Sequence, residues 1–280
     1  MSLLRAALAS PFKRPSPDAQ PPTTRLRRTV RADPARLTAY THLCGFPELP
    51  DGIGSTLPPT YPHVLAFPLA MRLMCDPEFP LPLLGLVHTS IGITQHQAIH
   101  PTEELQLDVH IAHLGPHRRG TEVTLVTEAR AADGTLLWES QSTYLARHKT
   151  PTPATSPTQQ PTPAPGIPGP GTPWRLAPDL GRRYSAVSGD RNPIHLHPLT
   201  ARPFGFPRAI AHGMWTAARC LAEHDTADDM KHGAKRKIRV EFKAPVPLPS
   251  TVTYASRGPA FELRSATGKP HLTGSSVVLP

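Results

Sequence analysis

The stretch YSAVSGDRNPIHLHP, residues 184–198, places several polar groups in one short loop directly after a helix-like segment. Glycine readily adopts the left-handed conformation that ends helices, so we expect the helix to stop at Gly189. The following Asn192-Pro193 pair favours a turn, because proline keeps the residue before it out of the helical region. The side chains that can converge on this stiff loop are those of Asp190, Asn192 and His195.

A carboxylate and an imidazole on such a loop can share one water molecule and activate it. One group accepts a proton while the other supplies one, and the pKa of histidine suits both roles near neutral pH. We expect Asp190 and His195 to take these roles, with the Asn192 amide orienting either partner. The alternative is a capping aspartate, a turn-forming asparagine and a surface histidine. These three residues alone do not decide between the two interpretations.

A second unusual stretch, AIAHGMWTAARCLAEH, occupies residues 209–224. From Met214 onward, its apolar residues recur at the i, i+3, i+4 and i+7 spacing of a buried helical stripe. Gly213 lets a ligand approach the backbone, and the free N–H groups at a helix start attract negative charge. Such N–H groups can stabilise an enolate-like oxyanion. With a water-activating pair, they predict addition of water to an α,β-unsaturated carbonyl compound, or its elimination.

A segment rich in Pro, Thr and Gly, residues 148–173, divides the chain. It has almost no large apolar residues, so it cannot pack a core, and its prolines favour an extended spacer. We therefore predict two folded parts, residues 23–147 and 174–280, joined by a proline-rich linker. Residues 1–22 are expected to form a loose basic tail.

The two parts repeat one order of elements, although hardly one sequence. A helix ending in glycine is predicted at 33–45 and again at 177–189, and a second, apolar helix from Pro62 and again from His212. Pro68 weakens the second prediction in the first part. Strands with alternating apolar residues come next, in the second part at 236–243, 251–256, 260–266 and 271–279. A helix followed by antiparallel strands predicts an α+β fold, with the helix packed on one face of the sheet.

The charge distribution argues against a nucleic-acid-binding protein. The formal net charge of the 280-residue chain is +9, but residues 1–36 alone carry eight Lys and Arg residues against two Asp. A basic end segment is more often a solvated arm than a specific binding surface. Because no zinc-finger, homeodomain or RRM signature accompanies it, we expect no nucleic-acid partner.

Membrane and secretory signals are also weak in this sequence. No apolar run reaches the roughly 18 residues of a spanning helix, so we expect no membrane insertion. The opening MSLLRAALAS is interrupted by Arg5 and is short for a signal sequence. The three cysteines, Cys44, Cys75 and Cys220, lack metal-binding or disulfide spacing, which fits a reducing compartment. We therefore expect a cytoplasmic protein.

The two unusual stretches together resemble the MaoC-like dehydratase and (R)-specific enoyl-CoA hydratase family. The resemblance extends from Trp174 to about Pro280, and its motif is long and specific. The residues that carry it are Tyr184, Ser188-Gly189-Asp190, Asn192-Pro193-Ile194-His195 and His212-Gly213-Met214.

This resemblance implies a fold, an activity and a set of site residues. The fold is the hot dog, an antiparallel sheet wrapped around a long central helix. The reaction is reversible hydration of trans-2-enoyl thioesters to (R)-3-hydroxyacyl thioesters. Asp190 and His195 become the catalytic acid/base pair, Asn192 their support, and the Gly213 N–H the oxyanion donor. The substrate is a thioester of coenzyme A or of an acyl carrier protein, and no metal or redox cofactor is implied.

The first part resembles a second, degenerate hot dog. It has GFPELPDGIGSTLPPTYP where the catalytic loop would stand, and Pro62-His63-Val64 where His-Gly-Met would open the second helix. Chains with two hot dogs in this family mimic a dimer of single hot dogs. The resemblance thus implies a double hot dog of two antiparallel sheets, each on a central helix, and the chain could act alone or pair again as a homodimer.

Further substrate contacts are expected next to the catalytic residues. His212 and Met214 flank Gly213, and Arg239 and Lys243 belong to a basic strand that could meet the phosphates of coenzyme A. The exposed side of a strand is usually charged in any case, so these two basic residues also fit a purely solvated face.

Three other interpretations compete with this one. His195, His197 and His212 could bind zinc, but prolines flank the HxH pair and no further ligand pattern accompanies it. A non-catalytic thioester-binding subunit would retain the motif for a partner complex, although the intact D-x-N-P-x-H and HGM motifs favour an enzyme. A hot-dog thioesterase would direct water at the carbonyl carbon, and such enzymes place their carboxylates differently.

Overall fold

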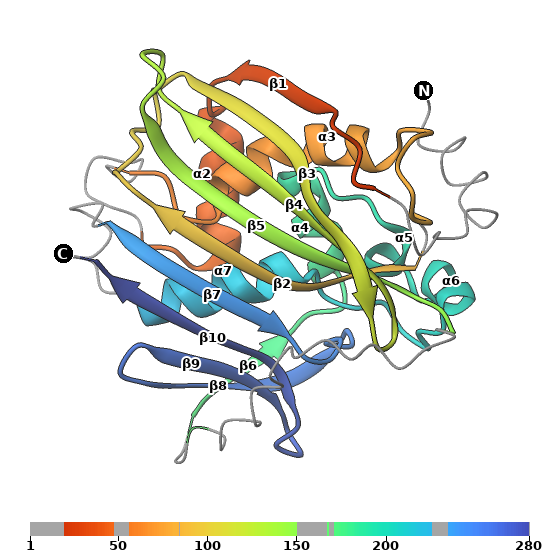
Figure 1. The fold of residues 1–280 in the computed structure, drawn as a ribbon. Helices are drawn as coiled ribbons and strands as arrows, with labels where there is room; N and C mark the ends of the chain where they lie inside the picture. Colours follow the sequence, from red (N-terminus) through yellow and green to blue (C-terminus); the bar gives the residue numbers. More distant parts are fainter. Residues whose placement is uncertain are drawn as a thin grey trace.

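The computed structural model describes residues 20–47, 56–83, 85–149, 167, 171–225 and 235–279. Most of the predicted basic tail and most of the predicted linker lie outside these residues. Within them, long antiparallel strands form a curved sheet, and the main helices cover one of its faces (Figure 1). No helix among the described residues combines the length and apolar character that a membrane-spanning helix requires.

The first half begins with a short edge strand and places its two helices before the long strands. Asp33 caps the first helix through its side chain, which accepts the Arg36 N–H at 2.7 Å, and Gly45 ends it with a φ of 77°. The elements are β1 (Arg25–Val30), α2 (Pro34–Cys44), α3 (Tyr61–Met74), β2 (Leu86–Gln95), β3 (Leu105–His117), β4 (Gly120–Arg130) and β5 (Leu136–Arg147).

The second half repeats this order and inserts short helices between its two longer ones. Gly189 ends the first longer helix with a φ of 81°, as predicted. The elements are β6 (Thr172–Leu176), α4 (Leu180–Ser188), α5 (Pro193–Leu196), α6 (Pro198–Ala201), the 3-10 turn η2 (Arg202–Phe204), α7 (Gly213–His224), β7 (Arg236–Phe242), β8 (Ser250–Arg257), β9 (Ala260–Ser265) and β10 (Pro270–Val278).

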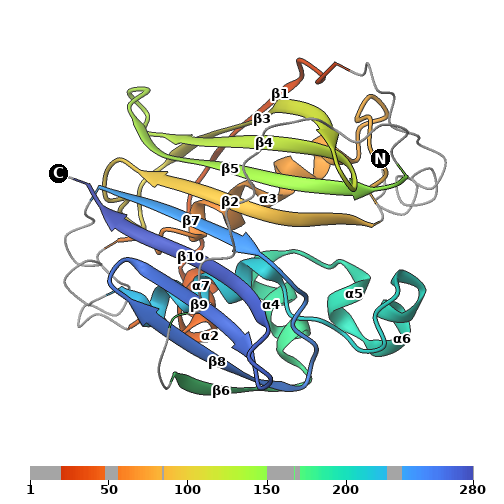
Figure 2. The same ribbon diagram turned by 60° about the horizontal axis from the view of Figure 1, so that its bottom comes forward.

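The two sheets are joined edge to edge. The strand order is β1-β3-β4-β5-β2-β7-β10-β9-β8-β6, one ten-stranded sheet whose halves mirror each other about the β2–β7 pair. Ile93 of β2 lies opposite Ile238 of β7, and both are fully buried. The expected pair of antiparallel sheets is therefore one continuous surface that curves around the helices (Figure 2).

The predicted helical stripe of α7 is confirmed by its burial. Ala217, Ala218 and Leu221 are fully buried beneath the sheet. In the first half, α3 continues through Pro68, the residue that weakens the helix prediction there. The ring of Pro68 is on the exposed side of the helix, where water can satisfy the carbonyl that loses its N–H partner.

The sequence did not reveal β1 and β6, the two outermost strands. β1 reads RLRRTV and is dominated by exposed arginines, while β6 begins inside the predicted proline-rich linker at Thr172. Arginines suit an edge strand because charge discourages pairing with another chain. Arg25 and Arg27 both bind Asp108 of the neighbouring strand.

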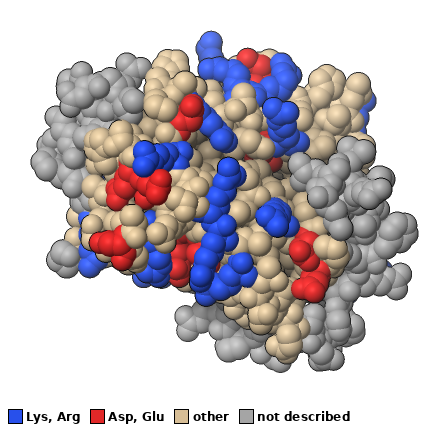
Figure 3. All heavy atoms as spheres, turned by 90° about the horizontal axis from the view of Figure 1, so that it is seen from above, with Lys and Arg blue, Asp and Glu red and all other residues tan. Residues whose placement is uncertain are grey.

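Across one face of the molecule, Lys and Arg side chains lie beside Asp and Glu side chains (Figure 3).

Candidate active site

Two serines of α4 hold the backbone of Asp190. The Ser188 hydroxyl accepts the Asp190 N–H at 3.1 Å, and the Ser185 hydroxyl donates to the Asp190 carbonyl at 2.6 Å. Both serines are buried, and the glycine between the helix and Asp190 supplies the left-handed turn that lets the chain reverse. The aspartate thus leaves the helix with both its N–H and its carbonyl held.

Asn192 acts as a cap in this structure. Its side-chain oxygen accepts the Ile194 N–H at 3.4 Å at the start of α5, and its own N–H donates to Oδ1 of Asp190 at 3.0 Å. Asn192 is exposed to solvent, unlike the buried His195. In this structure Asn192 therefore starts the short helix that carries His195 and also binds the Asp190 carboxylate through its backbone N–H.

His195 is buried, and its hydrogen bond fixes its tautomer. Nδ1 donates to the Ile210 carbonyl at 2.7 Å, which leaves the lone pair of the neutral ring on Nε2. A neutral imidazole with a free Nε2 can act as a general base.

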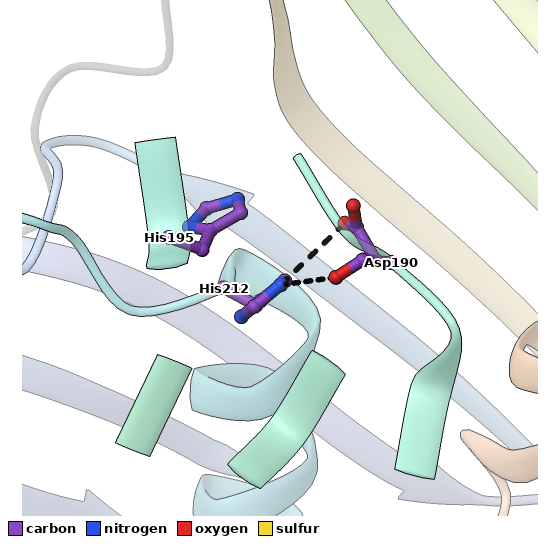
Figure 4. Close-up of side chains that lie close together, drawn as sticks. All are labelled: Asp190, His195 and His212. Atoms are coloured by element: carbon purple, nitrogen blue, oxygen red, sulfur yellow. Dashed lines mark hydrogen bonds and ion pairs between the residues drawn. The ribbon is translucent and has the colours of Figure 1, made fainter. Parts of the chain in front are cut away.

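His212 joins the two stretches that the sequence singled out. It sits at the N-cap of α7, and its Nε2 donates to the Asp190 carbonyl at 3.1 Å and lies 3.8 Å from Oδ2. Its ring stacks on that of His195, with centroids 3.7 Å apart and an interplanar angle of 26° (Figure 4). Asp190, His195 and His212 each offer one atom to a group that spans no more than 4.8 Å.

Burial controls the protonation of these three groups. It raises the pKa of Asp190, an effect that the nearby His195 opposes. It lowers the pKa of His195, opposed by Asp190, and it lowers the pKa of His212 well below its ordinary value. The pKa values of Asp190 and His195 therefore move toward each other, which suits two groups that exchange a proton with one water.

The same three residues have the donor types of a metal site, but their geometry does not suit one. A metal ion must lie close to the plane of each imidazole that binds it, along the nitrogen lone pair. His195 and His212 stack with ring centroids 3.7 Å apart, so an ion close to the plane of one ring would lie out of the plane of the other. The arrangement fits acid/base chemistry better than metal binding.

Gly213 begins α7 beside this cluster, and the first N–H groups of a helix have no partner within the helix. A side chain at this position would crowd its surroundings, because a Cβ would lie 3.1 to 3.3 Å from the ring of Phe242. Glycine thus allows the start of the helix to sit against the Phe242 ring. Met214, the next residue, is buried.

Comparison with known proteins gives this site a family. A model described as the MaoC like domain matches residues 154–257. The chain is 36% identical over 279 residues to the 3-hydroxyacyl-thioester dehydratase X of Mycobacterium tuberculosis, an alignment that covers 98% of this chain and 96% of that protein. The chain belongs to the MaoC-like dehydratase family.

Solved structures of MaoC-like dehydratases share the fold. A crystal structure of HtdX from Mycobacterium tuberculosis matches with a TM-score of 0.74 and 36% identity, covering 92% of this chain and 100% of that one. A MaoC-like dehydratase from Phytophthora capsici matches with a TM-score of 0.73 at 18% identity, covering 92% and 95% of the two chains, which shows the fold alone. The predicted double hot-dog fold is confirmed.

Two of the predicted substrate contacts, Arg239 and Lys243, lie on the surface of the second half. Arg239 alternates with the buried Ile238 and Val240, so it points from the sheet face opposite the helices. Lys243 is exposed and pairs with Glu241. The alternation that predicts the strand already implies this outward direction for Arg239, and contact with coenzyme A phosphates stays a prediction for both residues.

Residues of the first half also act on the end of α4 and on Asp190, and the sequence did not single them out as site residues. The Nε of Arg36 on α2 donates to the Val187 carbonyl at 2.6 Å. Tyr144 on β5 has its pKa raised by burial and by the charge of Asp190. Both residues are distant from the motif along the chain, and nothing in their local pattern marks them. The backbone carbonyl of Ile210, which orients His195, could not be predicted from the sequence either, because a residue of any type could supply it.

Proposed function

We propose that this protein reversibly hydrates trans-2-enoyl thioesters to (R)-3-hydroxyacyl thioesters, the carrier being coenzyme A or an acyl carrier protein. Family membership supports the reaction class. The observation that carries the residue assignment is the convergence of Asp190 and His195 next to the start of α7. The (R) configuration rests on the family resemblance of the motif.

The chemistry can be derived from the hydrogen bonds of each group. His195 Nε2, free because Nδ1 donates to a carbonyl, takes a proton from water as the water oxygen bonds to C3 of the enoyl group. The negative charge moves to the thioester oxygen, where the Gly213 N–H stabilises it. A proton then passes from the acid/base pair to C2, so the pair is restored and one water has been added. Dehydration runs the same steps in reverse.

His212 supports this cycle through contacts on both partners. Its Nε2–H holds the Asp190 carbonyl, and its ring stacks on His195. Because its pKa is held well below the ordinary value by burial, it stays neutral and adds no charge that would repel a protonated His195. Met214 remains a proposed substrate contact, since it lies next to Gly213 and is buried on the helix face.

The compartment and the assembly belong to this proposal as well. Cys44 and Cys220 are buried free cysteines, which fits work in the cytoplasm, as the sequence suggested. We propose no nucleic-acid partner. Since each chain already contains both halves of a hot-dog pair, association into a homodimer of double hot dogs is not needed to build the site.

The direct test is an assay of the purified chain with short- and medium-chain trans-2-enoyl-CoAs. Loss of the enoyl-thioester absorbance is followed, the configuration of the hydroxyacyl product is determined, and free thiol is titrated in parallel. We expect wild type to form (R)-3-hydroxyacyl-CoA without release of thiol, and Asp190→Asn to lose most of this rate.

Other outcomes would select the alternatives. Release of free coenzyme A without hydration would identify a thioesterase. Binding of enoyl-CoA and enoyl-acyl carrier protein by a folded protein, with no turnover of either, would identify a thioester-binding subunit.

A further inference from the structure

One arginine and one tryptophan cross between the halves, and each binds the last turn of the first helix of the other half. Arg36 of α2 donates from Nε to the Val187 carbonyl at 2.6 Å, two residues before the glycine that ends α4. Trp215 of α7 donates from Nε1 to the Leu43 carbonyl at 3.2 Å, two residues before the glycine that ends α2. Each half therefore caps a carbonyl in the last turn of the other half's first helix.

The two terminal glycines are also contacted in a reciprocal way. A Cβ on Gly189 would lie 3.3 Å from Nη2 of Arg36, and a Cβ on Gly45 would lie 3.1 Å from the guanidinium of Arg219. The two arginines thus rest on equivalent turns. The residues after those turns differ, because Asp190 comes directly after Gly189, whereas Phe46 comes after Gly45.

The location of Arg36 is unfavourable for its own helix. It lies in the first turn of α2, where the helix dipole disfavours a positive charge. Its guanidinium instead meets the C-terminal end of α4, where unpaired carbonyls and the negative end of the dipole favour a cation. The charge is therefore placed to serve α4 and the turn beyond it.

The segment that Arg36 holds is the one that fixes Asp190. Its contacts fall on Val187 and Gly189, on either side of Ser188, whose hydroxyl accepts the Asp190 N–H. The Asp190 carbonyl in turn accepts the Nε2–H of His212. A shift of this turn therefore moves both the Asp190 carboxylate and the Asp190 carbonyl that accepts from His212.

We propose that Arg36 is a positioning residue for catalysis, supplied by the half without the catalytic loop, which holds the α4 turn so that Asp190 meets His195 and His212. This proposal rests on the proposed function. Since errors of about 1 Å in the placement of reacting groups can reduce rates by about 100-fold, loss of the contact should appear in kcat. Arg36 touches the protein backbone and no reacting atom, so KM should change little.

The test compares Arg36→Met with Arg219→Met in the full chain. In both variants the new methionine side chain is long and uncharged. For each, kcat and KM are measured with a trans-2-enoyl-CoA, and the thermal midpoint is recorded. We expect Arg36→Met to lower kcat by about tenfold or more, with KM within about threefold of wild type. Arg219→Met also loses its ion pair with Glu223 and its contact over Trp174, so its midpoint should fall at least as far while kcat stays within about twofold.

The variant Arg36→Lys gives the conservative comparison, since it keeps the charge and one donor. It should recover part of the rate lost in Arg36→Met. An unchanged kcat in Arg36→Met overturns the proposal, as does an equal loss in Arg219→Met, which would mean general loosening. A rise in KM with kcat unchanged also overturns it, because that result would assign Arg36 to substrate binding.

An NMR readout keeps this test separate from the proposed activity. The imidazole resonances of His195 and His212 are assigned with Gln substitutions and compared between the two Met variants. We expect both resonances to shift in Arg36→Met and to stay in place in Arg219→Met. If the wild type turned over no enoyl thioester, the proposed function would fail, yet unmoved resonances in Arg36→Met would still overturn the positioning role by themselves.

Discussion

The first helices of the two halves end in the same way and lead to different chemistry. Tyr40 precedes Gly45 by the same spacing as Tyr184 precedes Gly189, both glycines are left-handed, and the two tyrosine rings lie 6.1 Å apart where the helices meet. The shared pattern therefore serves the junction of the halves. The acid/base groups that we propose, Asp190 and His195, follow Gly189, so in this proposal catalysis is added after one of two similar helix ends.

The second helices repeat this contrast. α7 begins at Gly213 after His212, whereas α3 begins at Tyr61 with Pro62 and the buried His63 in its first turn. Proline suits the first turn of a helix because its missing N–H would have had no partner there, yet for the same reason it offers no donor to a ligand. At the start of α3 the Tyr61 N–H donates to the Pro58 carbonyl at 2.8 Å and Pro62 has no N–H, so the first two positions of this helix offer no free donor.

The strongest test of this contrast is loss of the acid/base pair. Asp190→Asn and His195→Ala should each lower kcat by about 100-fold or more, because each removes one partner of general acid–base catalysis. The double variant should be little worse than the poorer single one, since the two act as a unit. His63→Ala, in the corresponding first-half helix, should keep kcat within about threefold. Thermal midpoints serve as the control, and a comparable loss in His63→Ala would contradict the assignment of catalysis to one half.

A second test uses the buried His63 and the half-buried His88 of the first half. Burial lowers the pKa of His63 to about 4 and that of His88 to about 3. In the unfolded chain these histidines have pKa values near 6.5 and become protonated at a pH where the native residues stay neutral. The free energy of unfolding must therefore fall as pH drops from about 6.5 toward 4. Between about pH 7.5 and 5, each histidine should account for about 2 kcal/mol of the lost stability.

Urea unfolding at the two pH values measures this effect. The pH dependence of the free energy of unfolding should shrink in His63→Gln and in His88→Gln. His113→Gln, which changes an exposed histidine, should leave it as in wild type. Equal pH dependence of the free energy of unfolding in wild type and all three variants would show that His63 and His88 are not held neutral in the native state.

A third test concerns the glycine that begins α7. Gly213→Ala retains the N–H, but its Cβ meets the Phe242 ring, so either the ring or the start of the helix must move. We expect about a tenfold loss in kcat with a stability cost of about 1 kcal/mol. Phe242→Leu in the same chain should restore part of the rate by making room. If Gly213→Ala is fully active without that second change, the N–H position does not limit the reaction.

The smallest expected effect is that of Asn192→Ala. As a helix cap with a long hydrogen bond, Asn192 should contribute about 0.5–1 kcal/mol to stability, and its loss should lower kcat only a few-fold. Side-by-side assays with Asp190→Asn distinguish a cap from a catalytic group. A loss as large as that of Asp190→Asn would return Asn192 to the catalytic set.

The sequence predicted those parts of the molecule whose cause is local. The helix ends at Gly45 and Gly189 and the alternating strands of the second half depend on neighbouring residues, and the structure confirms them. The motif also predicted Asp190, His195 and His212, which the structure brings together. The family resemblance supplied the double hot dog, which local patterns alone left as a generic α+β fold.

The features that the sequence missed depend on distant contacts. Arg36 reads as one more charge of a basic segment until α2 is packed against the end of α4. β1 and β6 are too polar or too short to stand out, because their strand structure comes from pairing with β3 and β8 at the sheet edges. Arg239 is the opposite case, since its local register correctly placed it on the outward side of β7, while its contact with coenzyme A phosphates stays a prediction.

The pairing of β2 with β7 has a consequence for how the protein responds to dilution. Two separate hot dogs would have to find each other, and their shared site would be lost at low concentration. Here the partner edge belongs to the same chain, so the second half is present at a fixed effective concentration. The specific activity should therefore be independent of the protein concentration in the assay. Any larger assembly would have to use surfaces other than this edge, which is already satisfied within each molecule.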